Sequence, residues 1–252
     1  MKLFITLSYI GTDFCGYQAQ KDKRTVQSEL NRACFELFGY ECDITGCSRT
    51  DSGVHANMFC ATVTKKGCQS IFTELSIEKI PLALNAHLPP DISVFDAEFK
   101  SEGFHPRYDV KYKEYIYRIY NSRLRSPFEE GRAWQIPYSF TDIDIERMNE
   151  ASQLFVGEHD FEAFMAQGSN VDSTVRNILY AGVERKDDII TFRVSADGFL
   201  YNMVRILTGT LIDIGRGKIS PEEIEDIILS RDRARAGATA PAHGLYLNKV
   251  VY

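Results

Sequence analysis

The residues best suited to chemistry lie in one short polar stretch, from Gly46 to Ala56. Within seven residues it contains an arginine, a carboxylate and a histidine, at Arg49, Asp51 and His55. A carboxylate beside a cationic partner stays ionised and can act as a nucleophile or a base. An isolated Asp-Ser-Gly tripeptide is more often an Asx turn, in which the aspartate bonds its own backbone. The neighbouring charges favour a reactive site over such a turn.

Two further residues could take part in chemistry but have ordinary explanations. Tyr115 lies in the tyrosine-rich run 112–120 and could pack beside Tyr117 as a strand residue. Arg205 falls in a stretch with helical spacing and could be a solvated arginine on an amphipathic helix. From the residues alone these explanations stay open.

The elements that must position these residues alternate between strands and helices. Thr25 is a suitable N-cap for a helix that Gly39 would end. Ser220, followed by a proline and two glutamates, predicts a helix start with a capping box and a proline at the first helical position. Other helices are predicted over 141–155 and around 203–211, and strands at 2–9, 58–63, 92–99, 112–120, 189–195 and 245–252. This pattern indicates an α+β fold with two mixed halves and a seam near 100–110.

Composition is that of an ordinary globular protein, with 252 residues, 44% hydrophobic and 25% charged. No run of about 18 apolar residues predicts a membrane span, and the N-terminal apolar run is too short for a secretory segment. The six cysteines form no C-x-x-C pair, which favours reduced thiols and disfavours a structural metal. We therefore expect a cytoplasmic protein.

The net charge of −6, from 29 basic and 35 acidic side chains, disfavours a protein that coats nucleic acid non-specifically. It does not exclude a local basic groove. The basic residues are in fact uneven, and they gather in three runs near 21–24, 107–125 and 231–235. Charge alone leaves RNA binding undecided.

Motifs along the whole chain resemble the TruA-type tRNA pseudouridine synthases. The stretch Arg49-Thr50-Asp51-Ser52-Gly53-Val54-His55-Ala56 is similar to the family signature R-T-D-x-G-V-H-A. Other family elements are matched, in order, by residues 9–18, 85–92, 104–107, 113–117, 157–161, 174–176, 199–205 and 241–247. The opening element departs from the family at one position, where Ile10 replaces the usual aspartate.

The resemblance implies a mixed, largely antiparallel sheet built from two ferredoxin-like (RRM-like) halves. Helices would cover its faces, and the active-site cleft would be central. The halves would be residues 1–105, with the aspartate motif, and 106–252, with the tyrosine and arginine of the site. The resemblance also implies a homodimer.

The resemblance further implies a reaction and a role for each matching residue. Uridine would become pseudouridine at positions 38, 39 and 40 in the tRNA anticodon arm, without metal or cofactor. Asp51 would attack a flipped-out uridine, Arg205 would pair with Asp51, and Tyr115 would stack on the base and help remove the C5 proton. Arg49 would occupy the space left by the base, and Leu245 and Leu247 would form an apolar wall under the uracil. His55 would be structural or would contact the RNA. The residues expected to contact phosphates are Lys21, Arg24, Arg107, Lys111 and Arg123.

Other functions fit the sequence less well. A non-catalytic RNA-binding protein need not keep Asp51 and its partners, and a glycoside hydrolase usually needs two placed carboxylates. Gly215-Arg216-Gly217-Lys218 only superficially resembles a phosphate-binding loop, because Ile219 follows the lysine. The alternative that stays open is a pseudouridine synthase of the same type with a divergent RNA target.

Overall fold

The computed structural model describes residues 1–168 and 171–252. The chain divides into two compact units, Met1–Lys111 together with Tyr246–Tyr252, and Tyr112–Leu245. The boundary thus lies at 111/112, whereas the sequence placed it at 105/106. The physical reason is hydrogen bonding within the first unit, where Tyr252 Oη donates to Pro106 O (2.8 Å) and Lys111 N donates to Val251 O (2.8 Å). No helix in the described residues is long and apolar enough to cross a membrane.

The first unit has the strand–helix–strand–strand–helix–strand order of a ferredoxin-like half. Its elements are β1 (Lys2–Tyr9), α1 (Val26–Phe38), β2 (Cys42–Gly46), β3 (His55–Lys65), α2 (Ile80–Asn85) and β4 (Ile92–Lys100), with a short 3-10 turn at Ile77–Lys79. Strand β1 pairs antiparallel with β4 on one side and β3 on the other, and β2 pairs antiparallel with β3. This order, β4-β1-β3-β2, confirms the predicted ferredoxin-like arrangement for the first half.

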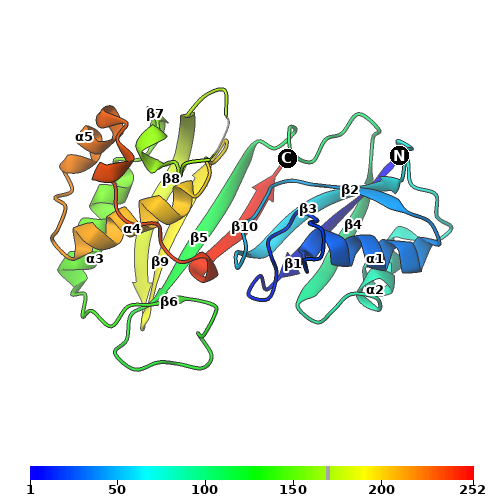
Figure 1. Cartoon of the computed structure of the whole chain (residues 1–252), viewed down its shortest axis with the longest axis horizontal. Helices are drawn as coiled ribbons and strands as arrows, with labels where there is room; N and C mark the ends of the chain where they lie inside the picture. The colour runs from blue at the N-terminus through cyan, green and yellow to red at the C-terminus, as the bar shows by residue number, and fades with distance from the viewer. Residues whose placement is uncertain (169–170) are drawn as a thin grey trace. The chain divides into compact units, whose positions relative to one another are not determined.

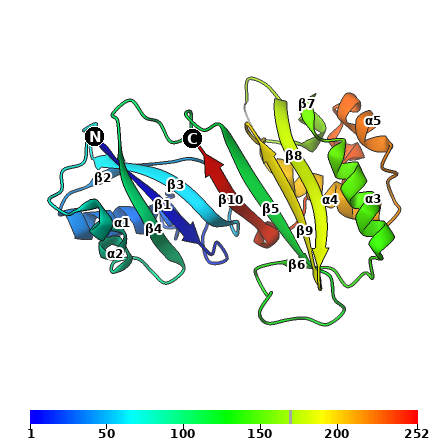
Figure 2. The ribbon, with the colours of Figure 1, turned by 180° about the vertical axis from the view of Figure 1, so that it is seen from behind.

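The second unit repeats part of this order with additions. Its elements are β5 (Tyr112–Tyr120), β6 (Trp134–Gln135), α3 (Asp142–Gln153), β7 (Gly157–Asp160), β8 (Val175–Lys186), β9 (Ile189–Ala196), α4 (Met203–Gly215) and α5 (Glu223–Ser230), with 3-10 turns at Glu162–Phe164, Arg233–Arg235 and Ala242–Gly244. Strands β5, β9, β8 and β7 pair antiparallel in that spatial order. Figures 1 and 2 show β5, β9 and β8 side by side, with α3 packed against β8 and α4.

The last strand, β10 (Leu245–Val251), pairs parallel with β3 and so belongs largely to the first unit. By chain order it would be the fourth strand of the second ferredoxin-like half. A parallel pair formed by the first third and the very end of the chain cannot be read from local sequence patterns.

Local signals in the sequence explain most element ends. Thr25 caps α1 through a complete capping box with Ser28, and Gly39 ends the helix at φ 73°. Thr141 caps α3 in the same way with Asp144. The predicted start of α5 is wrong by two residues. The helix begins at Glu223, and only half of the capping box forms, from Ser220 N to Glu223 Oε1 (2.8 Å).

Each unit has its own core. In the first, β1 places Leu3, Ile5 and Leu7 where water cannot reach them, and Leu30 of α1 is equally buried. In the second, Tyr117 and Ile119 of β5 are fully buried on the face they share with Tyr115, as the alternation predicted. The residues proposed for chemistry therefore belong to units with well-packed cores.

Candidate active site

Asp51 lies in the first unit, in the loop between β2 and β3, and is half-buried. Gly53 adopts φ 79°, a left-handed conformation that favours glycine, and Val54 N donates to Asp51 O (3.2 Å). Arg49, two residues before Asp51, is exposed. The turn therefore keeps the carboxylate close to the protein body while the arginine faces solvent.

The loop carrying Asp51 is held by the backbone of the segment after β1. A Cβ atom at Gly11 would lie 2.0 Å from Val54 O, and one at Gly16 would lie 2.8 Å from Thr50 O. Tyr17 N donates to Thr50 O (3.1 Å), and Gly53 N donates to Phe14 O (3.3 Å). Two glycines thus allow a backbone-to-backbone approach that side chains would prevent.

Buried side chains also hold the loop that carries Asp51 in place. Tyr9 Oη and Thr50 Oγ1 share a buried hydrogen bond of 2.7 Å. Gly11 N donates to His55 Nδ1 (2.9 Å), and the His55 ring stacks on Tyr246 at 4.5 Å between centroids. His55 is completely buried, and these contacts are with protein groups. This environment favours the structural one of the two roles expected for His55.

Tyr115 lies on β5 in the second unit and is 7% exposed. Its ring meets Phe199 edge to face, with centroids 5.0 Å apart. An edge-to-face contact of this kind holds an aromatic ring in one orientation. Phe199 belongs to a stretch that matched the family, but its motif alone indicated no role for it.

Arg205, near the start of α4, is positioned by two acceptors. Its Nε donates to Ala240 O (2.7 Å) and its Nη1 donates to Asn202 Oδ1 (2.7 Å). Asn202 precedes the helix in a left-handed conformation, with φ 59°. Both acceptors are uncharged, so these bonds orient the guanidinium without neutralising it. Sequence reasoning missed Asn202, although an asparagine just before a helix is a signal for such a conformation.

Tyr117 and His243 lie near Arg205 and near the segment 240–241, whose Ala240 carbonyl accepts its hydrogen bond. Tyr117 Oη donates to Pro241 O (2.6 Å), and burial raises the pKa of Tyr117 well above its usual value. Burial lowers the pKa of His243, and the Arg205 charge acts in the same direction. His243 is therefore neutral at neutral pH and adds no second positive charge near Arg205.

The two leucines expected to form an apolar wall are both buried at the start of β10. Leu245 is 6% exposed and Leu247 is not exposed at all. Leu247 is in register with Ala56 of β3, directly after the loop that carries Asp51. Leu245 belongs to the second unit and Leu247 to the first.

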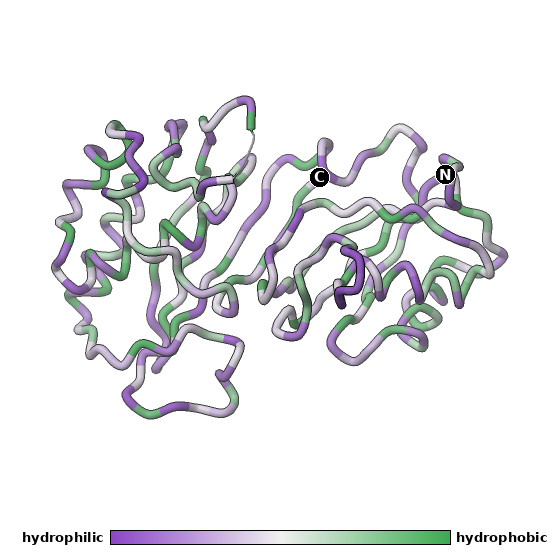
Figure 3. The backbone as a smooth tube through the Cα atoms, viewed as in Figure 1, coloured by the Kyte–Doolittle hydropathy of each residue, from purple (hydrophilic) through white to green (hydrophobic). Residues whose placement is uncertain are grey.

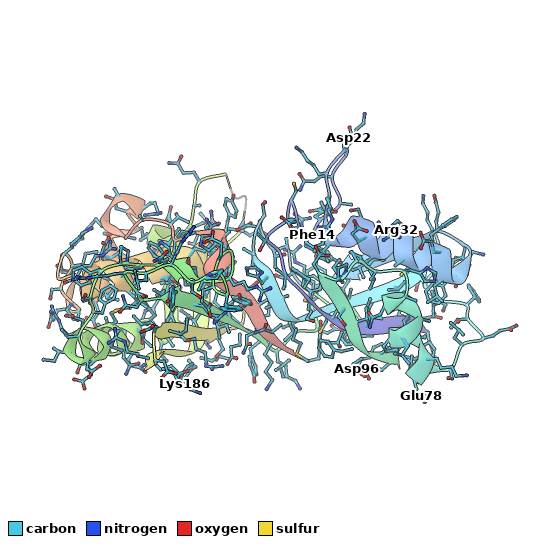
Figure 4. All side chains as sticks on the ribbon, turned by 90° about the horizontal axis from the view of Figure 1, so that it is seen from below. Phe14, Asp22, Arg32, Glu78, Asp96 and Lys186 are labelled. Atoms are coloured by element: carbon cyan, nitrogen blue, oxygen red, sulfur yellow. The ribbon has the colours of Figure 1, made fainter. Side chains whose placement is uncertain are left out.

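The five basic residues predicted to contact phosphates differ in their surroundings. Lys21 is exposed in the hydrophilic loop between β1 and α1 seen in Figure 3. Figure 4 shows the tip of this loop, at Asp22, standing away from the body of its unit. Arg107 and Arg123 are also exposed.

The other two basic residues have intramolecular partners. Arg24 donates to both carboxylate oxygens of Asp91 (2.8 and 3.0 Å) and lies 4.1 Å from the centre of the Phe14 ring. Lys111 Nζ donates to Tyr252 O (2.8 Å). The geometry gives no support to Arg24 as a phosphate contact, because Asp91 neutralises its charge.

Within the first unit, the structure brings Arg49, Asp51 and Leu247 to one region and places Arg107 beside Arg49 in a common pocket. Within the second, it places Tyr115 and Arg205 on β5 and α4, which pack together. Lys21 and Arg123 lie on separate exposed loops of the two units.

An α+β fold that carries a carboxylate on an ordered loop, an arginine oriented by hydrogen bonds and a buried aromatic ring is compatible with an enzyme of acid–base or nucleophilic chemistry. Comparison with known proteins narrows this class. The model of a tRNA pseudouridine synthase family matches residues 5–109 and 151–252. The chain belongs to this family, and is thus an isomerase. The resemblance inferred from the motifs is confirmed.

Individual relatives match over nearly their whole length. The chain is 42% identical over 250 residues to tRNA pseudouridine synthase A of Thermoanaerobacter sp., with 99% of each chain covered. It is 44% identical over 258 residues to the protein of that name from Bacillus licheniformis, covering 100% of this chain and 99% of the relative. A protein of Clostridium tetani named tRNA pseudouridine synthase A 2 is 42% identical over 250 residues, covering 98% of this chain and 97% of the relative.

Proposed function

We propose that this protein isomerises uridine to pseudouridine at positions 38, 39 and 40 in the anticodon stem-loop of tRNA. The observation that carries the proposal is full-length identity of 42–44% to enzymes named tRNA pseudouridine synthase A. The ordered Asp51 loop supports it, because a nucleophile must be presented in one conformation. An enzyme of the same type with a divergent RNA target is the second candidate.

In the proposed reaction, the Asp51 carboxylate attacks a flipped-out uridine at C6 of the base or at C1′ of the ribose. The N1–C1′ bond breaks, the uracil turns over, and C5 bonds to C1′. The bond to Asp51 is then released, and the proton on C5 leaves. No atom is gained or lost and no electron is transferred to an outside acceptor, so the reaction needs no cofactor.

The remaining site residues take complementary roles in this proposal. Arg205 keeps Asp51 ionised, which is consistent with hydrogen bonds that orient its guanidinium and leave its charge in place. Tyr115 stacks on the base and assists removal of the C5 proton. Arg49 occupies the space that the flipped base leaves, and its exposure suits that task. Leu245 and Leu247 form an apolar wall under the uracil.

The RNA partner would be held mainly by exposed basic residues. Lys21, Arg107 and Arg123 are the strongest candidates, since their side chains face solvent. Lys111 is a weaker one, because its Nζ already bonds a backbone carbonyl. The homodimer stays a prediction of the family resemblance, and the cytoplasmic location stays a prediction from the N-terminal segment and the cysteines.

Release of tritium from tRNA labelled at uridine C5 tests the reaction. Wild-type protein should release tritium, and Asp51→Asn should reduce the rate at least roughly 1000-fold, because an amide cannot act as the nucleophile. Asp96→Asn, an exposed aspartate on β4, is the matched control and should retain the wild-type rate. Full activity of Asp51→Asn would remove Asp51 from the mechanism.

The modified positions are tested with three tRNAs, each of which carries a uridine at only one of the positions 38, 39 and 40. Release from all three supports the full proposal. Release from none of them, with release from another RNA, would establish the divergent target instead.

A further inference from the structure

A polar pocket of about 220 Å³ lies entirely within the first unit. It is lined from five segments: the loop after β1, helix α1, strand β2, the loop that carries Asp51, and the turn at 105–108. The lining residues that matter here are Tyr17, Gln18, Ser48, Arg49, Arg107 and Tyr108. Aspartate and glutamate are absent from the lining residues, so the pocket is positively charged.

The two arginines of this pocket differ from those arginines of the described chain that form ion pairs. Arg24, Arg118 and Arg193, for example, are each within 3.0 Å of a carboxylate oxygen. In the part of the chain that the structure describes, Arg49 and Arg107 have no carboxylate partner. Arg107 can therefore bind a phosphate through its guanidinium, and Arg49 adds to the positive charge of the pocket.

The turn at 105–109 is built by its own hydrogen bonds. His105 N donates to Asp109 Oδ2 (2.9 Å), and Arg107 N donates to His105 Nδ1 (3.1 Å). Asp109, the nearby acid, is thus bonded within the turn and does not line the pocket. With Nδ1 accepting a hydrogen bond, the proton of a neutral His105 resides on Nε2, which leaves a second donor on this residue.

An aromatic platform stands at the edge of the same pocket. The rings of His105 and Tyr108 stack at 4.2 Å and 29°, yet Tyr108 is 76% exposed. One face of the tyrosine is therefore supported by protein and the ring is open to solvent. Aromatic rings presented in this way are platforms for unpaired bases.

A further polar group in the lining has no partner. Tyr17 is 3% exposed, and its hydroxyl has no hydrogen-bond partner in the described part of the chain. Buried hydroxyls without partners are rare in proteins and call for an explanation. This hydroxyl lies beneath the surface of the pocket, near the thiols of Cys34 and Cys47, so the pocket must be polar for other reasons.

We infer that this pocket is a subsite for one unpaired nucleotide of the RNA, with its phosphate bound by Arg107 and its base stacked on Tyr108. The inference rests on the proposed function, because it assigns part of the RNA path on the same loop that carries Asp51. In this inference Tyr108 stacks on the base, His105 supports the ring of Tyr108, and Arg107 binds the phosphate of this one nucleotide.

The test measures binding of a fluorescent anticodon-arm hairpin RNA at several salt concentrations. Tyr108→Ala should weaken binding by roughly 5- to 100-fold, and Tyr108→Phe should bind like wild type, because stacking needs the ring and not the hydroxyl. Arg107→Ala should weaken binding and reduce the slope of log K against log salt by about 1, as expected for loss of one phosphate contact. Arg107→Lys should keep the slope.

Matched controls come from the same unit. Phe95→Ala removes an exposed aromatic ring from β4, and Lys79→Ala removes an exposed charge, and both should bind like wild type. Steady-state tritium release should show a raised KM with an almost unchanged kcat for Tyr108→Ala. A merely structural role would instead lower the melting temperature and would not be rescued by Tyr108→Phe.

The outcomes separate this inference from the proposed function. If wild type isomerises tRNA while Tyr108→Ala and Arg107→Ala bind the hairpin like wild type, the subsite is overturned and the proposed function stands. If wild type releases no tritium but hairpin binding shows the expected losses, the proposed function fails and the subsite stands. Weak binding by Tyr108→Phe, equal to that of Tyr108→Ala, would also contradict base stacking.

Discussion

In the first unit Asp51 is placed by its backbone, whereas in the second unit Arg205 is placed by its own side chain. Gly11 and Gly16 let the segment after β1 touch the loop 50–54, and the main chain makes most of the contacts there. Arg205 sits on a regular helix, and its guanidinium is aimed by Asn202 and Ala240. A loop needs many backbone restraints to hold one conformation. The backbone of a helix is already rigid, so only the long side chain needs to be oriented.

The largest effect is expected from crowding the backbone contact of the first unit. Gly11→Ala would place a Cβ atom 2.0 Å from Val54 O, which is far inside contact distance. We expect a loss of about 3 kcal/mol or more in the free energy of unfolding. Urea denaturation measures it. Gly103→Ala is the matched control, since a Cβ there meets nothing within 4 Å. Equal urea midpoints for the two variants would show that the close backbone approach at Gly11 does not stabilise the loop that carries Asp51.

The next effect concerns the side-chain contact of the second unit. Asn202→Gly keeps the left-handed backbone at φ 59° and removes only the acceptor for Arg205. We expect kcat for tritium release to fall by roughly 10-fold, as for a lost hydrogen bond to a charged group, with little change in stability.

Asp187→Gly is the control for that substitution, because Asp187 is exposed and also left-handed, at φ 53°. It should retain the wild-type kcat. A variant Asn202→Gly with wild-type kcat would mean that Ala240 O alone is enough to orient Arg205.

A smaller effect is expected from the buried hydrogen bond between Tyr9 and Thr50. Tyr9→Phe leaves Thr50 Oγ1 without this 2.7 Å partner and should cost about 1 kcal/mol of stability. A double-mutant cycle with Thr50→Val measures the coupling between the two side chains. Tyr120→Phe serves as a control on β5. Zero coupling would show that the backbone contacts alone hold the loop.

The smallest effect is a pH dependence in the second unit. The pKa of His243 is lowered from 6.5, chiefly by burial, so the unfolded chain binds more protons than the folded one below about pH 6.5. Stability should therefore be fully present above this pH and decline as the pH falls. His243→Gln should flatten part of that decline in urea midpoints measured from pH 7 to 5. An unchanged pH profile would show that His243 does not contribute to the loss of stability at low pH.

Local patterns were enough to predict much of the fold. Thr25 and Gly39 mark both ends of α1, and the alternation of Tyr115, Tyr117 and Ile119 identified the buried face of β5. These features depend on residues a few positions apart. The start of α5 was misplaced because Pro221 and the glutamates fit a cap equally well two residues earlier. The site residues Asn202 and Phe199 were missed because their roles depend on a partner's orientation.

The sequence by itself determined which groups could react and the family to which they belong, because a motif is a property of neighbouring residues. Only the tertiary structure decided their environments. It buried His55 under Tyr246, paired Arg24 with Asp91, and brought Arg107 to the same pocket as Arg49, which lies 58 residues earlier in the chain. The physical reason is that burial and pairing depend on strand order and close packing between segments distant in the chain, which local propensity does not encode.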